Sequence, residues 1–344
     1  MPRCVTVAVP KTPSSLSHVT ATAAPSTRSF ADVFSSIAEN IEQIVYGKPE
    51  AIELALVCLL AEGHLLVEDV PGVGKTSLAK ALAGSIDCTW RRVQFTPDLL
   101  PADLVGVSVW QRATETFDFR PGPMFANIVL ADEINRASPK TQSALLESME
   151  ERQVTADGRT YTLPPPFMVI ATQNPVEQEG TYRLPESQLD RFLLRLSLGY
   201  PTRAAELTIL ETLGANEAII NLRPVATSEE ILQMVRAAKA VHLAPALKNY
   251  LVDLAEMSRR HPSLTLGMSP RATLQLARAV RARAVSQGRD FGTPDDVKAL
   301  ALPVLAHRLL VRHDAALQGV TGESAIDDVL GAVPVPMAPR AAGR

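Results

Sequence analysis

Five short apolar segments recur along the first part of the chain, and several of the stretches between them carry apolar residues at a helical period. The five segments are His64 to Val67, Trp90 to Phe95, Asn127 to Ala131, Phe167 to Thr172 and Leu193 to Leu198. Strands that alternate with helices are typical of a mostly parallel sheet with helices packed on both faces. We therefore expect an α/β domain over residues 29–222.

The two ends of the chain lack this pattern. Residues 1–28 are rich in Pro, Ser, Thr and Ala without a sustained period, which predicts a disordered tail. Ser29 followed by Asp32 is a capping-box start, and the helix that it predicts carries on one face Phe30, Val33, Phe34, Ile37 and Ile41. Residues 333–344 predict a second tail.

Only helical patterns follow residue 200. Thr227 with Glu230 forms a capping box, and two later helices begin at Ser269-Pro270 and Thr293-Pro294, with proline in the first helical position. We expect a small all-helical domain over residues 223–332. No internal repeat is visible.

Two β-hairpins are expected as inserts in the α/β domain. The first is formed by Val105 to Trp110 and Phe117 to Arg120, which are short β-prone segments around polar residues. In the second, Asp157-Gly158 joins Gln153 to Ala156 with Arg159 to Leu163. Asp-Gly between β-prone segments favours a two-residue hairpin turn. From the residues alone, both hairpins could be packing elements that contact no other molecule.

A glycine-rich turn joins the first apolar segment to a helix that begins at Lys75. Glycines let backbone N–H groups curl around phosphate oxygens, and a helix N-terminus adds positive potential. Lys75 would reach the β- and γ-phosphates of ATP, and the Thr76 hydroxyl would bind Mg²⁺. The expected nucleotide-binding residues are Pro71, Gly72, Val73, Gly74, Lys75, Thr76 and Ser77. Asp69 stands where the full P-loop pattern has its first glycine, so the pattern leaves the loop entry undefined.

Two adjacent carboxylates, Asp132 and Glu133, follow the apolar segment that ends at Ala131. The carboxyl ends of parallel strands face the crevice in which such sheets bind ligands. We expect Asp132 to hold Mg²⁺ and Glu133 to polarise the attacking water, a role that needs a carboxylate within hydrogen-bond reach. Asn174, at the end of the next strand, could orient that water against the γ-phosphate.

The ordered set of motifs resembles the AAA+ ATPases, and more closely their MoxR branch, over roughly residues 30–330. The specific matches are Gln94-Phe95-Thr96-Pro97-Asp98-Leu99-Leu100-Pro101-Ala102-Asp103-Leu104, Arg120-Pro121-Gly122-Pro123 and Asp132-Glu133-Ile134-Asn135-Arg136. The resemblance implies that Asn174 is the sensor 1 residue. It implies that Arg271 is the sensor 2 arginine, reaching the nucleotide from the lid, and that Arg191 is the arginine finger of the neighbouring subunit's site.

The resemblance also implies that adenine is framed by Val45, Tyr46 and Gly47, and that subunits assemble as homo-oligomeric rings, usually hexamers, with ATP between them. A guanidinium fork suits phosphate oxygens and can offset transition-state charge. Each arginine also has a plainer interpretation from the residues alone. Arg271 could pair with an acid at a helix start, and Arg191 could form a surface ion pair. Arg195 is the next candidate finger.

Overall composition indicates which binding partners and which cell compartment to expect. The 344 residues carry a net charge of −3, which gives no general attraction to nucleic acid or anionic lipid. Apolar stretches are too short to span a membrane, and no secretory signal is visible. The three cysteines form no CxxC pair, so we expect reduced thiols in a cytoplasmic protein.

The function that we expect is a MoxR-type AAA+ ATPase coupling ATP hydrolysis to chaperone-like remodelling, assembly, or metal or cofactor insertion. The resemblance implies a separate partner with a von Willebrand factor A domain, and a protein client that the hairpins engage. A second hypothesis is a nucleic-acid motor, since the two-hairpin layout also resembles minichromosome maintenance helicases and magnesium chelatase motors. Net charge and the 5% aromatic content argue against it. A third, a nucleotide-binding scaffold without turnover, is opposed by Asp132 and Glu133.

Overall fold

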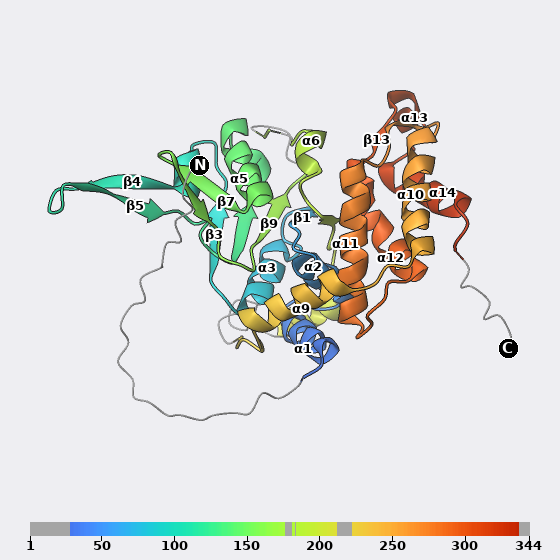
Figure 1. Ribbon diagram of the computed structural model, residues 1–344, viewed down its shortest axis with the longest axis horizontal. Helices are drawn as coiled ribbons and strands as arrows, with labels where there is room; N and C mark the ends of the chain where they lie inside the picture. Colours follow the sequence, from blue (N-terminus) through green and yellow to red (C-terminus); the bar gives the residue numbers. More distant parts are fainter. Residues whose placement is uncertain (1–27, 176–180, 183, 212–221, 337–344) are drawn as a thin grey trace.

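The computed structural model describes residues 28–175, 181–182, 184–211 and 222–336, which form an α/β domain and a neighbouring helical domain (Figure 1). In the α/β domain the elements are α1 (Phe30–Glu42), α2 (Pro49–Leu60), β1 (Leu65–Glu68), α3 (Lys75–Gly84), β2 (Ile86–Asp87), β3 (Trp90–Gln94), α4 (Pro101–Val105), β4 (Gly106–Gln111), β5 (Thr116–Pro121), β6 (Ile128–Asp132), η1 (Ile134–Arg136), α5 (Pro139–Glu151), β7 (Gln153–Ala156), β8 (Arg159–Thr162), β9 (Met168–Gln173), α6 (Glu186–Leu189), β10 (Leu194–Leu196) and α7 (Arg203–Glu211).

The helical domain, or lid, follows. Its elements are β11 (Ala226–Thr227), α9 (Ser228–Ala240), α10 (Pro245–Arg260), β12 (Leu264–Leu266), α11 (Pro270–Ser286), α12 (Pro294–Leu305), η2 (Ala306–Arg308), β13 (Leu310–Val311), α13 (His313–Leu317) and α14 (Gly322–Ala332). The expected capping box of Thr227 and Glu230 is present, and Pro270 and Pro294 open their helices. The expectation of helices alone is wrong in one respect. β11 pairs with β2 of the α/β domain, and β12 pairs with β13.

A five-stranded sheet forms the centre of the α/β domain, in the order β10-β1-β9-β6-β3, and every neighbouring pair is parallel. Alternate residues of a strand face opposite sides of a sheet. Accordingly Leu65 and Val67 join a core with α1, α2, α3 and the lid, whereas Leu66 joins a second core with α5. The parallel α/β fold is therefore confirmed. Because the five strands are parallel, their carboxyl ends meet along one edge of the sheet, and the loop between β1 and α3 lies at that edge.

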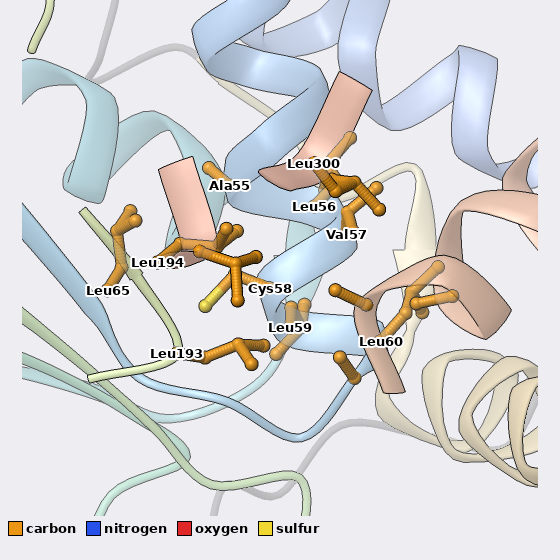
Figure 2. Packing of buried hydrophobic residues seen from close by; sticks show 14 of the residues in the cluster. Ala55, Leu56, Val57, Cys58, Leu59, Leu60, Leu65, Leu193, Leu194 and Leu300 are labelled. Atoms are coloured by element: carbon orange, nitrogen blue, oxygen red, sulfur yellow. The ribbon is translucent and has the colours of Figure 1, made fainter. Parts of the chain in front are cut away.

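Helix α2 lies between the sheet and the lid. Figure 2 shows the side chains of its residues 55–60 among Leu65 and Leu194 from the sheet and Leu300 from α12. Leu65, Leu194 and Leu300 are fully buried. Burial of such side chains stabilises a fold by roughly 1.5–3 kcal/mol each. The lid thus shares its apolar core with the nucleotide domain.

Both expected hairpins are present. β4 pairs with β5, and this hairpin projects from the body of the α/β domain (Figure 1). β7 pairs with β8 across Asp157 and Gly158, whose φ angles are 50° and 74°. Two successive positive φ angles are what a type I′ turn requires. The Asp-Gly signal therefore predicted the right turn.

The structure confirms the capping box at Ser29, whose hydroxyl accepts a hydrogen bond from the Asp32 N–H while the Asp32 side chain accepts from the Ser29 N–H. At the other end Val333 is buried against α14. Residues 1–27 and 337–344, where tails are expected, lie outside the described residues. Across the residues described, no helix combines the length and apolar character needed to cross a membrane.

Candidate nucleotide site

The turn between β1 and α3 forms an open cradle. Gly72 and Gly74 have φ angles of +85° and +97°, a backbone conformation that residues other than glycine rarely adopt. A Cβ at either position would meet no atom within 4 Å beyond its chain neighbours. This open space, lined by backbone and followed by the N-terminus of α3, suits a phosphate group. The loop from Pro71 to Ser77 therefore has room for a phosphate, and ATP binding by these residues stays a prediction.

Asp69, which replaces the first P-loop glycine, anchors the loop. Its Oδ1 accepts a hydrogen bond from the Val70 N–H over 2.8 Å. Its Oδ2 accepts one from the Ser197 hydroxyl over 2.8 Å and one from the Gly199 N–H over 2.6 Å. Burial alone would raise the pKa of Asp69, but these hydrogen bonds favour the carboxylate and hold the pKa below its usual value. The loop entry is thereby fixed to the segment after β10.

Lys75 lies across the loop. Its Nζ donates to the backbone carbonyls of Asp69, at 2.5 Å, and Gln173, at 3.0 Å. Gln173 ends β9, the strand beside β1. A charged phosphate oxygen is a stronger acceptor than either carbonyl. Lys75 is therefore held at the mouth of the cradle, where a phosphate can take over its hydrogen bonds.

Thr76 and Asp132 are brought together as expected for a magnesium site. The Thr76 hydroxyl donates to Oδ2 of Asp132 over 3.2 Å, and the Thr172 hydroxyl donates to Oδ1 over 2.5 Å. Hydroxyl and carboxylate oxygens are the ligands that Mg²⁺ takes from proteins beside substrate phosphates. Within the described residues, no group of three His, Cys, Asp or Glu side chains could hold a different metal.

Arg92 was not anticipated from the sequence. From β3 it binds Oδ2 of Asp132 through Nη2 at 2.8 Å and through Nε at 3.1 Å. The register of β3 with β6 would have predicted this contact, because a side chain on β3 lies near the end of β6 when the two strands are neighbours. The Arg92 guanidinium pairs with the Asp132 carboxylate, which is the group expected to bind Mg²⁺.

Glu133 follows Asp132 with a positive φ of 57°, which turns its side chain away from the strand. The Glu133 N–H donates to the Thr172 hydroxyl over 2.9 Å. Oε2 of Glu133 accepts from Gln94, at 2.9 Å, and from Arg136, at 3.0 Å. The expected base is thus held by two donors that the sequence argument did not include.

Asn174 comes directly after β9 and is buried. The sheet order puts β9 between β1, which carries the phosphate loop, and β6, which carries Asp132. Its backbone carbonyl accepts a hydrogen bond from Asn135 over 3.3 Å. Asn174 therefore lies at the same edge of the sheet as the loop and Asp132, and its sensor role stays a prediction.

Arg191 and Arg271 lie together, and both bind Glu150 at the end of α5. Arg191 Nε is 3.2 Å from Oε2, and Arg271 Nη1 is 2.6 Å from Oε1. Both arginines line a small cavity of about 100 Å³ that also includes His64, just before the first residue of β1. The phosphate loop is at the other end of β1. At about 3.3 Å per residue, the separation is on the order of 15 Å.

This placement corrects one expectation. Arg271 does not reach the phosphate loop of its own chain, because the start of α11 packs at the opposite end of β1. Arg191 is also away from its own loop, as a residue acting on a neighbour would be. The plainer interpretation, an acid partner for each arginine, describes the contacts within one chain. Two more guanidinium groups, those of Arg152 and Arg278, line the same cavity, so cations outnumber the carboxylates of Glu62 and Glu150 there.

A buried arginine connects the lid to the segment that carries Arg191. Arg308 of η2 lies 2.9 Å (Nε to Oδ1) from Asp190, and it also donates to the Phe192 carbonyl. Burial lowers the pKa of Arg308 to about 10, and the Asp190 carboxylate opposes this effect. Arg308 therefore remains charged at neutral pH, and it fixes η2 to both neighbours of Arg191.

A larger cavity of about 900 Å³ lies between the nucleotide domain and the lid. Its lining includes Gly47, Glu68 and Leu198 from the nucleotide domain and Leu302 and Ala306 from the lid. Of the three residues expected to frame adenine, Gly47 lines this cavity and Val45 is buried in the core. The apolar lining beside the phosphate loop suits a nucleotide base.

Comparison with known proteins identifies the family of this chain. Residues 64–194 match the model of the ATPase family associated with various cellular activities (AAA), and residues 256–329 match the AAA lid domain. The uncharacterized protein YeaC of Bacillus subtilis is 48% identical over 87% of this chain and 93% of its own. Chaperone MoxR1 of Mycobacterium tuberculosis is 40% identical over 86% of this chain and 81% of its own.

A solved structure shares the whole architecture. A Cytophaga hutchinsonii protein described as a candidate ATPase superposes with a TM-score of 0.82 at 34% identity, covering 90% of this chain and 96% of the other. The similarity therefore includes both the nucleotide domain and the lid.

Proposed function

Because the chain belongs to the MoxR family of AAA+ ATPases, we propose that it hydrolyses ATP to ADP and phosphate with Mg²⁺ and uses the energy to remodel a partner protein. The observation that carries this proposal is the convergence of Lys75, Thr76, Asp132 and Glu133 on the open cradle of Gly72 and Gly74. A scaffold that only bound nucleotide would not need Glu133.

Each residue has a distinct part in the proposed reaction. The loop N–H groups and Lys75 would hold the phosphates, and Thr76 and Asp132 would hold Mg²⁺, which would supply positive charge against the phosphate oxygens. Glu133 accepts a proton from the attacking water, and Asn174 orients that water. Oε2 of Glu133 is engaged by Gln94 and Arg136. These bonds have to rearrange before the carboxylate acts as a base.

In this proposal, a neighbouring subunit supplies an arginine to each ATP site. Arg191 and Arg271 share Glu150 on a surface remote from their own loop. In a ring, usually a hexamer in this family, that surface faces the next subunit's ATP. An arginine supplied by a neighbour can raise turnover about a thousandfold or more. Neither arginine can do this in an isolated subunit.

Remodelling is assigned to the two hairpins. Trp110 and Phe117 face each other across β4 and β5, with ring centroids 5.1 Å apart, and both are exposed. Exposed aromatic residues on a projecting hairpin are suited to a protein surface. The similarity to a chaperone supports a protein client. A cytoplasmic location and a partner with a von Willebrand factor A domain are parts of the same proposal.

Phosphate release measures the proposed activity. We expect the wild-type protein to release phosphate from ATP with Mg²⁺, and Glu133→Gln to bind ATP but release phosphate at least about a hundredfold more slowly. Affinity capture with the stalled Glu133→Gln protein then tests for a client. Absent turnover in an assembled wild-type ring would contradict the proposal, and turnover that responds only to DNA would favour the nucleic-acid motor.

A further inference from the structure

Arg195 links the nucleotide domain to the lid. It is the middle residue of β10, and its Nη1 lies 3.2 Å from Oε2 of Glu68. Its Nη2 binds Oε1 of Glu323. Glu68 is the last residue of β1, directly before the phosphate loop, and Glu323 lies in the first turn of α14. One guanidinium therefore connects the entry of the loop to the lid.

The contacts continue from Glu68 to Lys75. Gln173 donates through Nε2 to the other oxygen of Glu68 over 3.1 Å, and its carbonyl accepts from Lys75 over 3.0 Å. Glu68 and Gln173 face each other in the register of β1 and β9. A phosphate in the cradle draws the Lys75 ammonium toward itself, because charge-assisted bonds are the stronger ones. Any such movement acts first on Gln173 and then on Glu68.

The three charged groups also face the nucleotide cavity. Glu68, Arg195 and Glu323 all line the space of about 900 Å³. Their side chains are 25%, 28% and 42% exposed, respectively. Ion pairs with this much solvent contribute little to stability. Two carboxylates also share one guanidinium, so an anion that enters the cavity competes directly for Arg195.

From this arrangement we propose that Arg195 is a positioning residue, which couples the placement of α14 to the nucleotide in the phosphate loop of the same subunit. The inference rests on the proposed ATP site. With no nucleotide, Arg195 holds Glu323 and Glu68 together. A bound nucleotide shifts Lys75, Gln173 and Glu68. The ion pair of Arg195 with Glu68 then changes, and with it the ion pair of Arg195 with Glu323. Arg195 thus acts within its own chain rather than as a finger.

Hydrogen exchange of residues 322–332, measured with and without saturating Mg·ADP, tests this coupling. In the wild-type protein we expect nucleotide to change the exchange of α14 by about fivefold or more, the usual lower range for coupled sites. Arg195→Ala and Glu323→Gln should both lose this response, and Arg195→Ala should also bind a fluorescent ADP analogue about five- to tenfold more weakly. Arg195→Lys keeps the charge but not the fork, and should restore part of both.

The control is Arg312→Ala, which removes an exposed ion pair with Asp314 elsewhere in the lid and should leave both readouts unchanged. A full nucleotide response of α14 in Arg195→Ala and Glu323→Gln would overturn the inference, even if basal protection fell, since that pattern means only a structural role. Glu323→Gln decides the matter if Arg195→Ala fails to fold, because it keeps the shape of a half-exposed side chain.

The wild-type measurement separates this inference from the proposed function. A wild-type protein that binds no nucleotide would contradict both the inference and the proposed function. A wild-type protein that binds and hydrolyses ATP, with variants that remain fully coupled, would end the inference alone.

Discussion

The side-chain amide of Gln94, at the end of β3, donates a hydrogen bond to Oε2 of Glu133 over 2.9 Å. Arg136 approaches the same oxygen from three residues along the chain. Two donors on one carboxylate oxygen fix the direction in which the carboxylate points. The proposed base is therefore restrained in the subunit described here.

Gln94→Ala tests this restraint. Removing one donor should free the carboxylate and raise basal ATP turnover by about three- to tenfold, which corresponds to a hydrogen bond of roughly 0.5–1.5 kcal/mol. Steady-state phosphate release measures the change, with Gln287→Ala on the lid as the control. A fall in turnover would mean that Gln94 orients Glu133 productively instead.

Asp69→Asn should weaken both the fold and ATP binding at neutral pH, because three donors lose a charged acceptor. The expected loss of stability is about 1–3 kcal/mol. The folded pKa of Asp69 is below its usual value of 3.8, so its contribution is present above that value and is lost as the pH falls through the folded pKa.

Urea unfolding at pH 7 and at pH 3 measures this dependence. Wild type and Asp69→Asn should differ at pH 7 and approach each other in acid. Asp118→Asn on the projecting hairpin is the matched control, and should match wild type at pH 7. An undiminished difference at the lowest pH would show that the charge of Asp69 is not what anchors the loop.

Arg191→Ala should bind ATP almost normally, since its own Lys75 and Thr76 remain, yet lose turnover by about a thousandfold. Mixing it with Lys75→Ala, which is itself inactive, should restore part of the activity, because some intact ATP sites then meet an intact arginine. Phosphate release from the mixture and light scattering are measured together. An inactive mixture that co-assembles would refute a role for Arg191 in a neighbouring site.

Arg271→Ala should give the same result in the same mixing experiment, because Arg271 binds Glu150 beside Arg191. An arginine that served its own subunit would give a different outcome. In that case the Arg271→Ala subunit would lack a working site of its own, and mixing with Lys75→Ala would rescue nothing.

Replacing both Trp110 and Phe117 by alanine should leave basal ATP turnover within about twofold. The pair is exposed at the projecting hairpin, so its loss removes contact area without opening the core. Stimulation of turnover by a non-native polypeptide such as casein should disappear. Thr114→Ala and Thr116→Ala at the same tip provide the control. Full stimulation in the aromatic double variant would place client contact elsewhere.

The parts of the site that the sequence predicted are those encoded locally. The loop from Pro71 to Ser77 and the pair Asp132-Glu133 each follow a strand of adequate length, and Asp157-Gly158 specifies its own turn. Strands β11 and β12–β13 have two or three residues, too few to show a period. The position of Arg271 depends on how the lid packs, since its partner Glu150 is 121 residues away. Arg92 and Gln94 likewise required the register of β3 with β6.

Arg308 joins the lid to Asp190 and Phe192, the two residues on either side of Arg191. A lid that tilts would therefore move Arg191 with it. If Arg191 acts on a neighbouring subunit as proposed, the lid position of one subunit would set the position of the arginine at the next subunit's ATP site. In a closed ring this effect would run in one direction around the ring.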